Sequence, residues 1–149
     1  MAFDESADLI GSYEAQLDTL GLLIGDLSEE VQDDGGAWTI AQILNHLLDG
    51  EQRYAGRIRR VRRERRPAMR VMPNADYDRL SALAAWTKLY ELRRQNLSLV
   101  KSLKRDEWRR SGTLVPVGRV TIESLVRHVV AHGDMHIAQI ARRLSGRPA

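Results

Sequence analysis

The sequence predicts an all-α protein, an antiparallel up-and-down four-helix bundle, with a single domain over residues 1–149. Three observations favour this fold. Four long segments repeat their apolar residues with the helical period of about 3.6. Stretches rich in polar residues, glycine or proline separate these segments. No segment alternates with the period of two that a strand shows, at least over a convincing length.

The first two predicted helices differ in how clearly their ends are marked. The first runs from Ser6 to Leu27 on apolar periodicity alone. The second runs from Thr39 to Arg65 and opens with a capping box, in which Thr39 is the N-cap and Gln42 answers three residues later. Pro67 ends it, because proline has no amide hydrogen and disfavours helix in the residue before it.

The second half of the chain contains two more predicted helices. The third runs from Arg79 to Leu103 and is followed by a short turn, Asp106–Trp108, that should place a tryptophan against the end of the bundle. Glycine, proline and β-branched residues then predict a loop or an extended passage over Gly112–Val120. Thr121 is the predicted N-cap of the fourth helix, which runs to Leu144.

The composition excludes several classes of function. The chain has no cysteine, so it forms no disulfide and offers neither a thiolate metal ligand nor a cysteine nucleophile. Any metal must therefore be held by nitrogen and oxygen. Absence of cysteine agrees with a cytoplasmic location. No window approaches the roughly 18–20 apolar residues of a membrane span, so no membrane partner is expected.

Arginines crowd the end of the second predicted helix. They are Arg53, Arg57, Arg59, Arg60, Arg62, Arg63, Arg65 and Arg66. Such a run can bind nucleic acid or an anionic substrate. These arginines are spread around the helix, however, and cations are also favoured at its negative carboxyl end. With a net charge of only +3, the chain is not expected to bind nucleic acid.

All four histidines lie in two of the predicted helices. His128, His132 and His136 follow at four-residue intervals in the last helix, so neighbours share a face roughly 6 Å apart along the axis. Such a pair can bind one metal ion, and His46 of the second helix could add a third imidazole. Three protein ligands leave open positions, as in catalytic metal sites. The spacing suits His128 with His132 as well as His132 with His136.

Two aspartates lie near these histidines in the sequence. Asp49 follows His46 by three residues, and we interpret it as a candidate catalytic residue that orients an imidazole or acts as a base. The alternative for Asp49 is a solvated surface carboxylate. Asp134 lies about 200° around the helix from His132, so it should face away from the site.

Three further residues complete this neighbourhood. Gln139 lies one turn past His136 and either contacts substrate or packs at the edge of the core. Gly50 and Gly133 carry no side-chain bulk close to the candidate ligands. We therefore expect both glycines to leave space for a small-molecule substrate.

Several short motifs stand along the chain in a consistent order. They are Trp38-Thr39, Asn45-His46-Leu-Leu-Asp49, Glu107-Trp108, Thr121 and the run from His128 to Ile140. Together they resemble the DinB/YfiT-like family over about residues 6–144. The resemblance implies a four-helix bundle whose divalent metal is held by one histidine of the second helix and an H-x-x-x-H pair of the last. In this chain these ligands are His46, His132 and His136, and His128 becomes a neighbouring residue.

The same resemblance implies a function. It points to a metal-dependent enzyme, because related proteins include S-transferases that use low-molecular-weight thiols such as bacillithiol, and mycothiol-dependent isomerases. The metal would be Zn, Ni, Fe or Mn, since three imidazoles accept most of these divalent ions. The metal would activate a thiol or a water. A homodimer is also implied. The alternatives are hydrolase-like chemistry and a non-catalytic, metal-binding stress-response protein.

Overall fold

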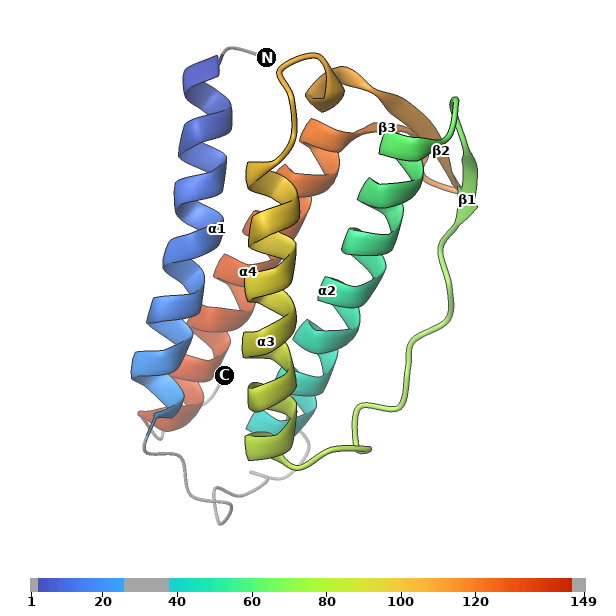
Figure 1. Cartoon of the computed structure of the whole chain (residues 1–149). Coiled ribbons are helices and arrows are strands. Elements are labelled where there is room, and N and C mark those ends of the chain that lie inside the picture. Colours follow the sequence, from blue (N-terminus) through green and yellow to red (C-terminus); the bar gives the residue numbers. More distant parts are fainter. Residues whose placement is uncertain (1–2, 26–37, 146–149) are drawn as a thin grey trace.

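The computed structural model describes residues 3–25 and 38–145 (Figure 1). These residues form four long helices: α1 (Phe3–Ile24), α2 (Ile40–Arg63), α3 (Ala82–Lys101) and α4 (Ile122–Leu144). The end predicted for the first helix, at Leu27, lies outside the described residues. None of the described helices combines the length and apolar content needed to cross a membrane.

α2 and α3 run in the same direction (Figure 1). Near their amino ends the Asn45 amide donates to the Leu80 carbonyl at 2.9 Å, and near their carboxyl ends Arg62 pairs with Glu107 at 2.7 Å. The predicted antiparallel up-and-down order is therefore wrong for this pair. The connection 64–81 allows the reversal, because extended chain covers about 3.3 Å a residue and can return along a helix about 36 Å long.

The helices pack so that sequence neighbours are not always neighbours in space. α1 lies against α3 and α4, and α2 also lies against α3 and α4, so α1 is diagonally opposite α2 (Figure 1). α2 and α4 run in opposite directions, since His46 near the start of α2 faces His132 and His136 in the second half of α4. This antiparallel contact carries the candidate site.

Capping interactions fix where two helices begin. Thr39 and Gln42 form both hydrogen bonds of the predicted capping box at the start of α2. Thr121 caps α4, as predicted, and Ser124 completes a second capping box there. Each box satisfies backbone amides that the first helical turn leaves without partners. α2 ends at Arg63, before Pro67 is reached.

A small sheet stands at one end of the bundle, so the prediction of a purely α-helical protein is wrong. β1 (Ala68–Arg70) pairs in parallel with β2 (Ser111–Val115), and β2 pairs with β3 (Gly118–Thr121) in an antiparallel hairpin. Strands of 3 to 5 residues are too short to show a period of two in the sequence. Their buried residues, Met69 and Leu114 among them, extend the core.

The short turn predicted around Asp106–Trp108 is confirmed. It forms a 3₁₀ turn, η1 (Glu107–Arg109), and Trp108 is buried in the same apolar cluster as the inner face of the sheet. The Glu107 carboxylate accepts hydrogen bonds from Arg62 and from the Lys104 amide. These contacts hold the turn against the carboxyl ends of α2 and α3.

A polar layer divides the core into two apolar halves. We define this layer as Tyr13, Gln16, Glu51, Arg93 and Asn96, all of them buried. On each side of it lies one apolar cluster, the first reaching the sheet and the second reaching the opposite end of the bundle. The layer places charge and amide groups at inward positions of α2 and α3, where an apolar pattern would predict aliphatic side chains.

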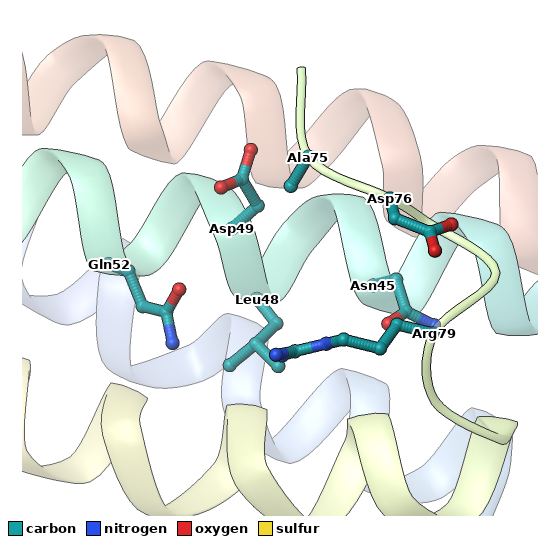
Figure 2. A pocket seen from close by; sticks show the side chains of 7 residues that line it. All are labelled: Asn45, Leu48, Asp49, Gln52, Ala75, Asp76 and Arg79. Carbon is teal, nitrogen blue, oxygen red and sulfur yellow. The ribbon is translucent and has the colours of Figure 1, made fainter. Parts of the chain in front are cut away.

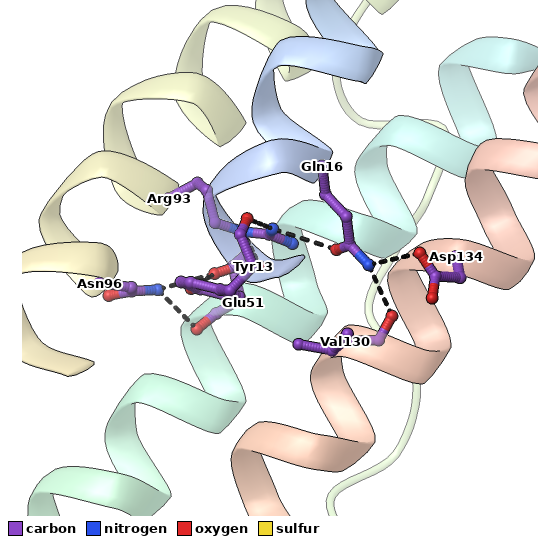
Figure 3. Close-up of polar contacts among 7 residues, drawn as sticks. All are labelled: Tyr13, Gln16, Glu51, Arg93, Asn96, Val130 and Asp134. Carbon is purple, nitrogen blue, oxygen red and sulfur yellow. Dashed lines mark hydrogen bonds and ion pairs between the residues drawn. The ribbon is translucent and has the colours of Figure 1, made fainter. Parts of the chain in front are cut away.

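Glu51 and Arg93 form the centre of the polar layer and are only 2% and 3% exposed. Arg93 Nε lies 2.5 Å from Glu51 Oε1, while the Asn96 amide and the Tyr13 hydroxyl donate to Oε2 (Figure 3). Burial, followed by the Glu51 carboxylate, raises the pKa of Tyr13, so its phenol remains a donor. Both carboxylate oxygens thus have donors, which a buried ion pair requires.

Gln16 joins the polar layer to α4. Its Nε2 donates to the Val130 carbonyl at 2.6 Å and to the Asp134 carboxylate at 2.9 Å, while its Oε1 accepts from Arg93 (Figure 3). Asp134 therefore faces away from the histidines, as predicted. A Cβ at Gly133 would lie 2.2 Å from Gln16 Oε1, so this glycine permits the approach of α1. The expectation that Gly133 leaves space for substrate is wrong.

We expect Arg93→Met to lower the free energy of unfolding by about 3–5 kcal/mol, because it leaves the Glu51 carboxylate buried without a counter-ion. Adding Glu51→Leu should recover most of that loss, since it removes the unpaired charge. Urea unfolding measures both effects. As a control, Arg127→Met removes an exposed pair with Glu123 and should cost less than about 1 kcal/mol. Equal losses for Arg93→Met and Arg127→Met would contradict the prediction.

Candidate metal centre

Three of the four histidines converge between α2 and α4. One nitrogen from each of His46, His132 and His136 lies within 4.8 Å of the other two. The Nε2 atoms of His46 and His132 are 2.7 Å apart, and those of His132 and His136 are 3.1 Å apart. The structure thus brings together the three residues that the family resemblance implied as a set.

Their surroundings keep these imidazoles neutral. Burial and, second to it, the neighbouring His136 lower the pKa of His46 to about 4. The pKa of His132 is also about 4, again through burial first and then through the nearby imidazoles. A protonated imidazole would be poorly solvated here and would face the other rings. At neutral pH both side chains are therefore unprotonated. Neutral imidazole is the form that binds a metal.

Gln139 sets the orientation of the His136 ring. Its Oε1 lies 2.7 Å from His136 Nδ1, and an amide oxygen can only accept, so Nδ1 carries the hydrogen. The lone pair of His136 is therefore on Nε2, directed at His132. The sequence left two roles open for Gln139, contact with substrate and packing at the edge of the core. The structure gives it a third role, orienting the His136 ring, which its spacing of three residues from His136 could have indicated.

Aromatic rings enclose the cluster on one side. Trp38 is parallel to the His136 ring, with 4° between planes and 6.4 Å between centroids. Tyr77, from the connection between α2 and α3, meets the His46 ring edge-on at 5.0 Å. Trp38 and Tyr77 also contact each other at 5.5 Å. These rings pack around the ring of His46, whose Nδ1 has no hydrogen-bond partner among the described residues.

Asp49 points at the connection between α2 and α3 and lines a cavity of 210 Å³ there (Figure 2). Its carboxylate accepts from Arg53 at 2.9 Å and from the Tyr77 hydroxyl at 3.4 Å. Arg53 in turn donates to the backbone carbonyls of Met72 and Pro73. Asp49 therefore helps to hold the chain segment that carries Tyr77 beside the histidines.

His128 stands outside the cluster. Its ring stacks on His132 with 6.2 Å between centroids and packs on Tyr54 at 5.2 Å. The reason is that α2 and α4 are antiparallel. His46, near the start of α2, is level with the second half of α4, whereas His128 lies in the first half of α4. Gly50 lies beside the His132 ring, since a Cβ there would be 3.9 Å from it.

The donor set fits a divalent metal ion. His132 Nε2 faces two other Nε2 atoms, and it can donate one hydrogen to only one of them. With the hydrogen of His136 on Nδ1, lone pairs still face one another inside the cluster. A shared cation turns this repulsion into coordination. Three neutral nitrogen donors suit a divalent transition-metal ion.

The fold and the site define a four-helix bundle with a three-histidine centre. A family model described as the DinB superfamily matches residues 13–140, so the chain belongs to this superfamily, as its motifs predicted. It is also similar to the solved structure of YfiT from Bacillus subtilis, with a TM-score of 0.86 and 21% identity over 99% of this chain and 91% of that chain. YfiT is described as a probable metal-dependent hydrolase with an unusual four-helix bundle topology. No curated protein matches the chain.

We expect the metal-free protein to lose stability as the pH falls from about 6.5 to about 4. The folded pKa values of His46 and His132 lie below that of an unfolded histidine, so the unfolded chain takes up protons first. The contribution of His46 and His132 to the free energy of unfolding is complete above pH 6.5. It is lost as these histidines take up protons in the folded protein. Chemical unfolding across this range measures it. The variant His46→Gln/His132→Gln should show a shallower slope, and an unchanged slope would refute the assignment.

Removing the acceptor on Gln139 should weaken metal binding. We expect Gln139→Met to lower Zn²⁺ affinity about 10- to 100-fold, because the His136 ring loses the partner that fixes its hydrogen on Nδ1. Competition with a chromophoric chelator gives the affinity. Gln139→Glu keeps an acceptor and should retain binding, and Gln52→Met is an exposed control on α2. Affinities that do not differ between Gln139→Met and Gln139→Glu would count against this role.

Proposed function

We propose that this protein is a divalent-metal-dependent enzyme whose ion is held by His46, His132 and His136. The observation that carries the proposal is the convergence of three neutral imidazole nitrogens from two helices. Three protein ligands are typical of catalytic sites, because they leave positions for a substrate. The partial exposure of His46 and His132 gives a small molecule access to the centre.

The reaction that we propose is transfer of a low-molecular-weight thiol to an electrophilic small molecule. The chain has no cysteine, so the sulfur must come from the thiol cofactor. The thiol loses its proton to solvent, its sulfur bonds to the electrophilic carbon, and the leaving group departs with the electron pair. A bound divalent ion supplies Lewis acidity, which lowers the pKa of a thiol or a water.

The residues around the histidines have separate roles in this proposal. Gln139 keeps the lone pair of His136 directed into the centre. Trp38 and Tyr77 restrict water beside the reacting groups. Asp49 is a positioning residue, since it binds the Tyr77 hydroxyl and Arg53. The role of Asp49 as a catalytic base stays a prediction.

Two alternatives follow from specific observations. Hydrolysis by an activated water is supported by the description of YfiT as a probable metal-dependent hydrolase. A non-catalytic metal-binding protein of the stress response needs only the three histidines. A homodimer, a cytoplasmic location and a single domain over residues 1–149 stay predictions.

Thiol-dependent turnover tests the proposal. Protein loaded in turn with Zn²⁺, Ni²⁺, Fe²⁺ or Mn²⁺ is given 1-chloro-2,4-dinitrobenzene with bacillithiol, mycothiol, glutathione or cysteine. We expect turnover that requires both metal and thiol. His132→Ala should bind no metal and fall to the background rate, because it removes the central ligand. The matched control for metal loss is His128→Ala, which lies one turn away and should keep the bound metal.

Each alternative gives a different result in the same assay. Metal-dependent cleavage of p-nitrophenyl acetate without any thiol would replace the transferase with a hydrolase. One equivalent of bound metal with no turnover of either substrate would favour the non-catalytic protein. Failure to bind any of the four metals would overturn the proposed function as a whole.

A further inference from the structure

A second cavity, of 440 Å³, lies between α2, the β2–β3 hairpin and the first turns of α4. We call it the hairpin cavity. Its polar lining comprises Tyr54 and Arg57 from α2, Arg119 from β3, and Ser124 and His128 from α4. None of these residues belongs to the polar layer or to the proposed ligand set.

The hairpin cavity carries positive charge that the described carboxylates do not neutralise. Arg57 and Arg119 form no ion pair within the described part of the chain, whereas Arg53 and Arg60 of the same helical run each pair with a carboxylate. The Arg57 guanidinium lies 5.2 Å from the centre of the Tyr54 ring, which holds it at the cavity wall. The amino end of α4 adds partial positive charge. This lining suits an anion.

The rest of the hairpin cavity is apolar. Its aliphatic lining consists of Val71, Leu114, Val117, Val120 and Leu125. Val71 and Val117 are 46% and 68% exposed, so both are accessible to a ligand. The volume falls within the range of roughly 300–1,000 Å³ that is common for small-molecule sites. The ligand that matches both linings is an organic anion with an apolar body.

His128 joins the hairpin cavity to the metal centre. It lines the cavity, and its ring stacks on His132 with 6.2 Å between centroids. The two histidines are one helical turn apart, about 6 Å along the axis of α4. A ligand in the hairpin cavity that touches His128 is therefore one ring away from a proposed metal ligand.

We propose that the hairpin cavity binds a small organic carboxylate with an apolar body, and that such acids are the substrate class of the metal centre. The carboxylate lies between Arg57 and Arg119, because planar guanidinium groups bind carboxylates through two parallel hydrogen bonds. The apolar body contacts the aliphatic wall. The second half of the proposal rests on the proposed function, whereas binding of the carboxylate requires no metal.

Binding of hexanoate to the metal-free protein, followed by NMR titration, tests the cavity. We expect saturable binding, with acetate and hexanamide each at least about tenfold weaker, because one lacks the apolar body and the other lacks the charge. Equal binding of hexanoate and hexanamide would overturn the proposal. Hexyl phosphate distinguishes the two common oxyanions, and a clear preference for it over hexanoate would overturn the carboxylate assignment.

Variants locate the binding site. Arg57→Met and Arg119→Met should each weaken hexanoate binding about tenfold, because each removes one charge-assisted contact. Arg105→Met is the matched control, since Arg105 is exposed and lies outside the cavity. Unchanged uptake of Zn²⁺ by the first two variants shows that they are folded. Hexanoate affinity that survives both cavity substitutions would refute the site.

Paramagnetic Mn²⁺ tests the link to the metal centre. In Mn²⁺-loaded protein we expect broadening of the hexanoate proton signals, and no such broadening in His132→Ala at the same Mn²⁺ concentration. Bound Mn²⁺ and bound hexanoate without broadening would overturn the substrate assignment. Failure of the wild type to bind Mn²⁺ or any other divalent ion would refute the proposed function, while the titrations of the metal-free protein would still decide the carboxylate site.

Discussion

The ion pair between Glu51 and Arg93 constrains the whole bundle, because neither charge is tolerated in the apolar interior without the other. A slip of α2 along α3 by one turn would separate the two charges. Gln16 then fixes α1 against α4 through the Val130 carbonyl and Asp134. The polar layer thus determines the axial register of the helices, while the two apolar clusters supply the burial that stabilises them.

The histidine cluster depends on that register. His46 meets His132 and His136 only if α2 and α4 are antiparallel and correctly aligned. Around the cluster, Gln139 fixes the ring of His136, while Trp38 and Tyr77 pack against the rings of His136 and His46. The hairpin cavity begins one turn along α4, and its two arginines form no ion pair with the carboxylates that the structure describes. Reactivity and recognition would then occupy consecutive turns of one helix.

The sequence predicted the helices and the histidine set much better than it predicted their arrangement. Periodicity and capping residues located the helices because both depend on nearby residues. The direction of α3 depends on the connection 64–81, which carries no local signal, and the strands are too short to show one. Apolar periodicity did not predict that Glu51 and Arg93 face inward, because it locates core positions by their apolar residues and these two are charged. Spacing alone left two histidine pairs open, and only the opposed direction of α2 and α4 separates His128 from the cluster.

The diagonal placement of α1 and α2 also bears on how the chain folds. Two consecutive helices of a bundle usually form a hairpin that can assemble early from local contacts. Here α1 can pack only after α3 and α4 are in place. The main contacts of α4 are with α1 and α2 (Figure 1). The contacts of α1 with α3 and α4 therefore close long loops, and this entropic cost precedes the gain in stability. Folding should be slower than in helical proteins of the same length, and neither half of the chain should acquire native structure alone.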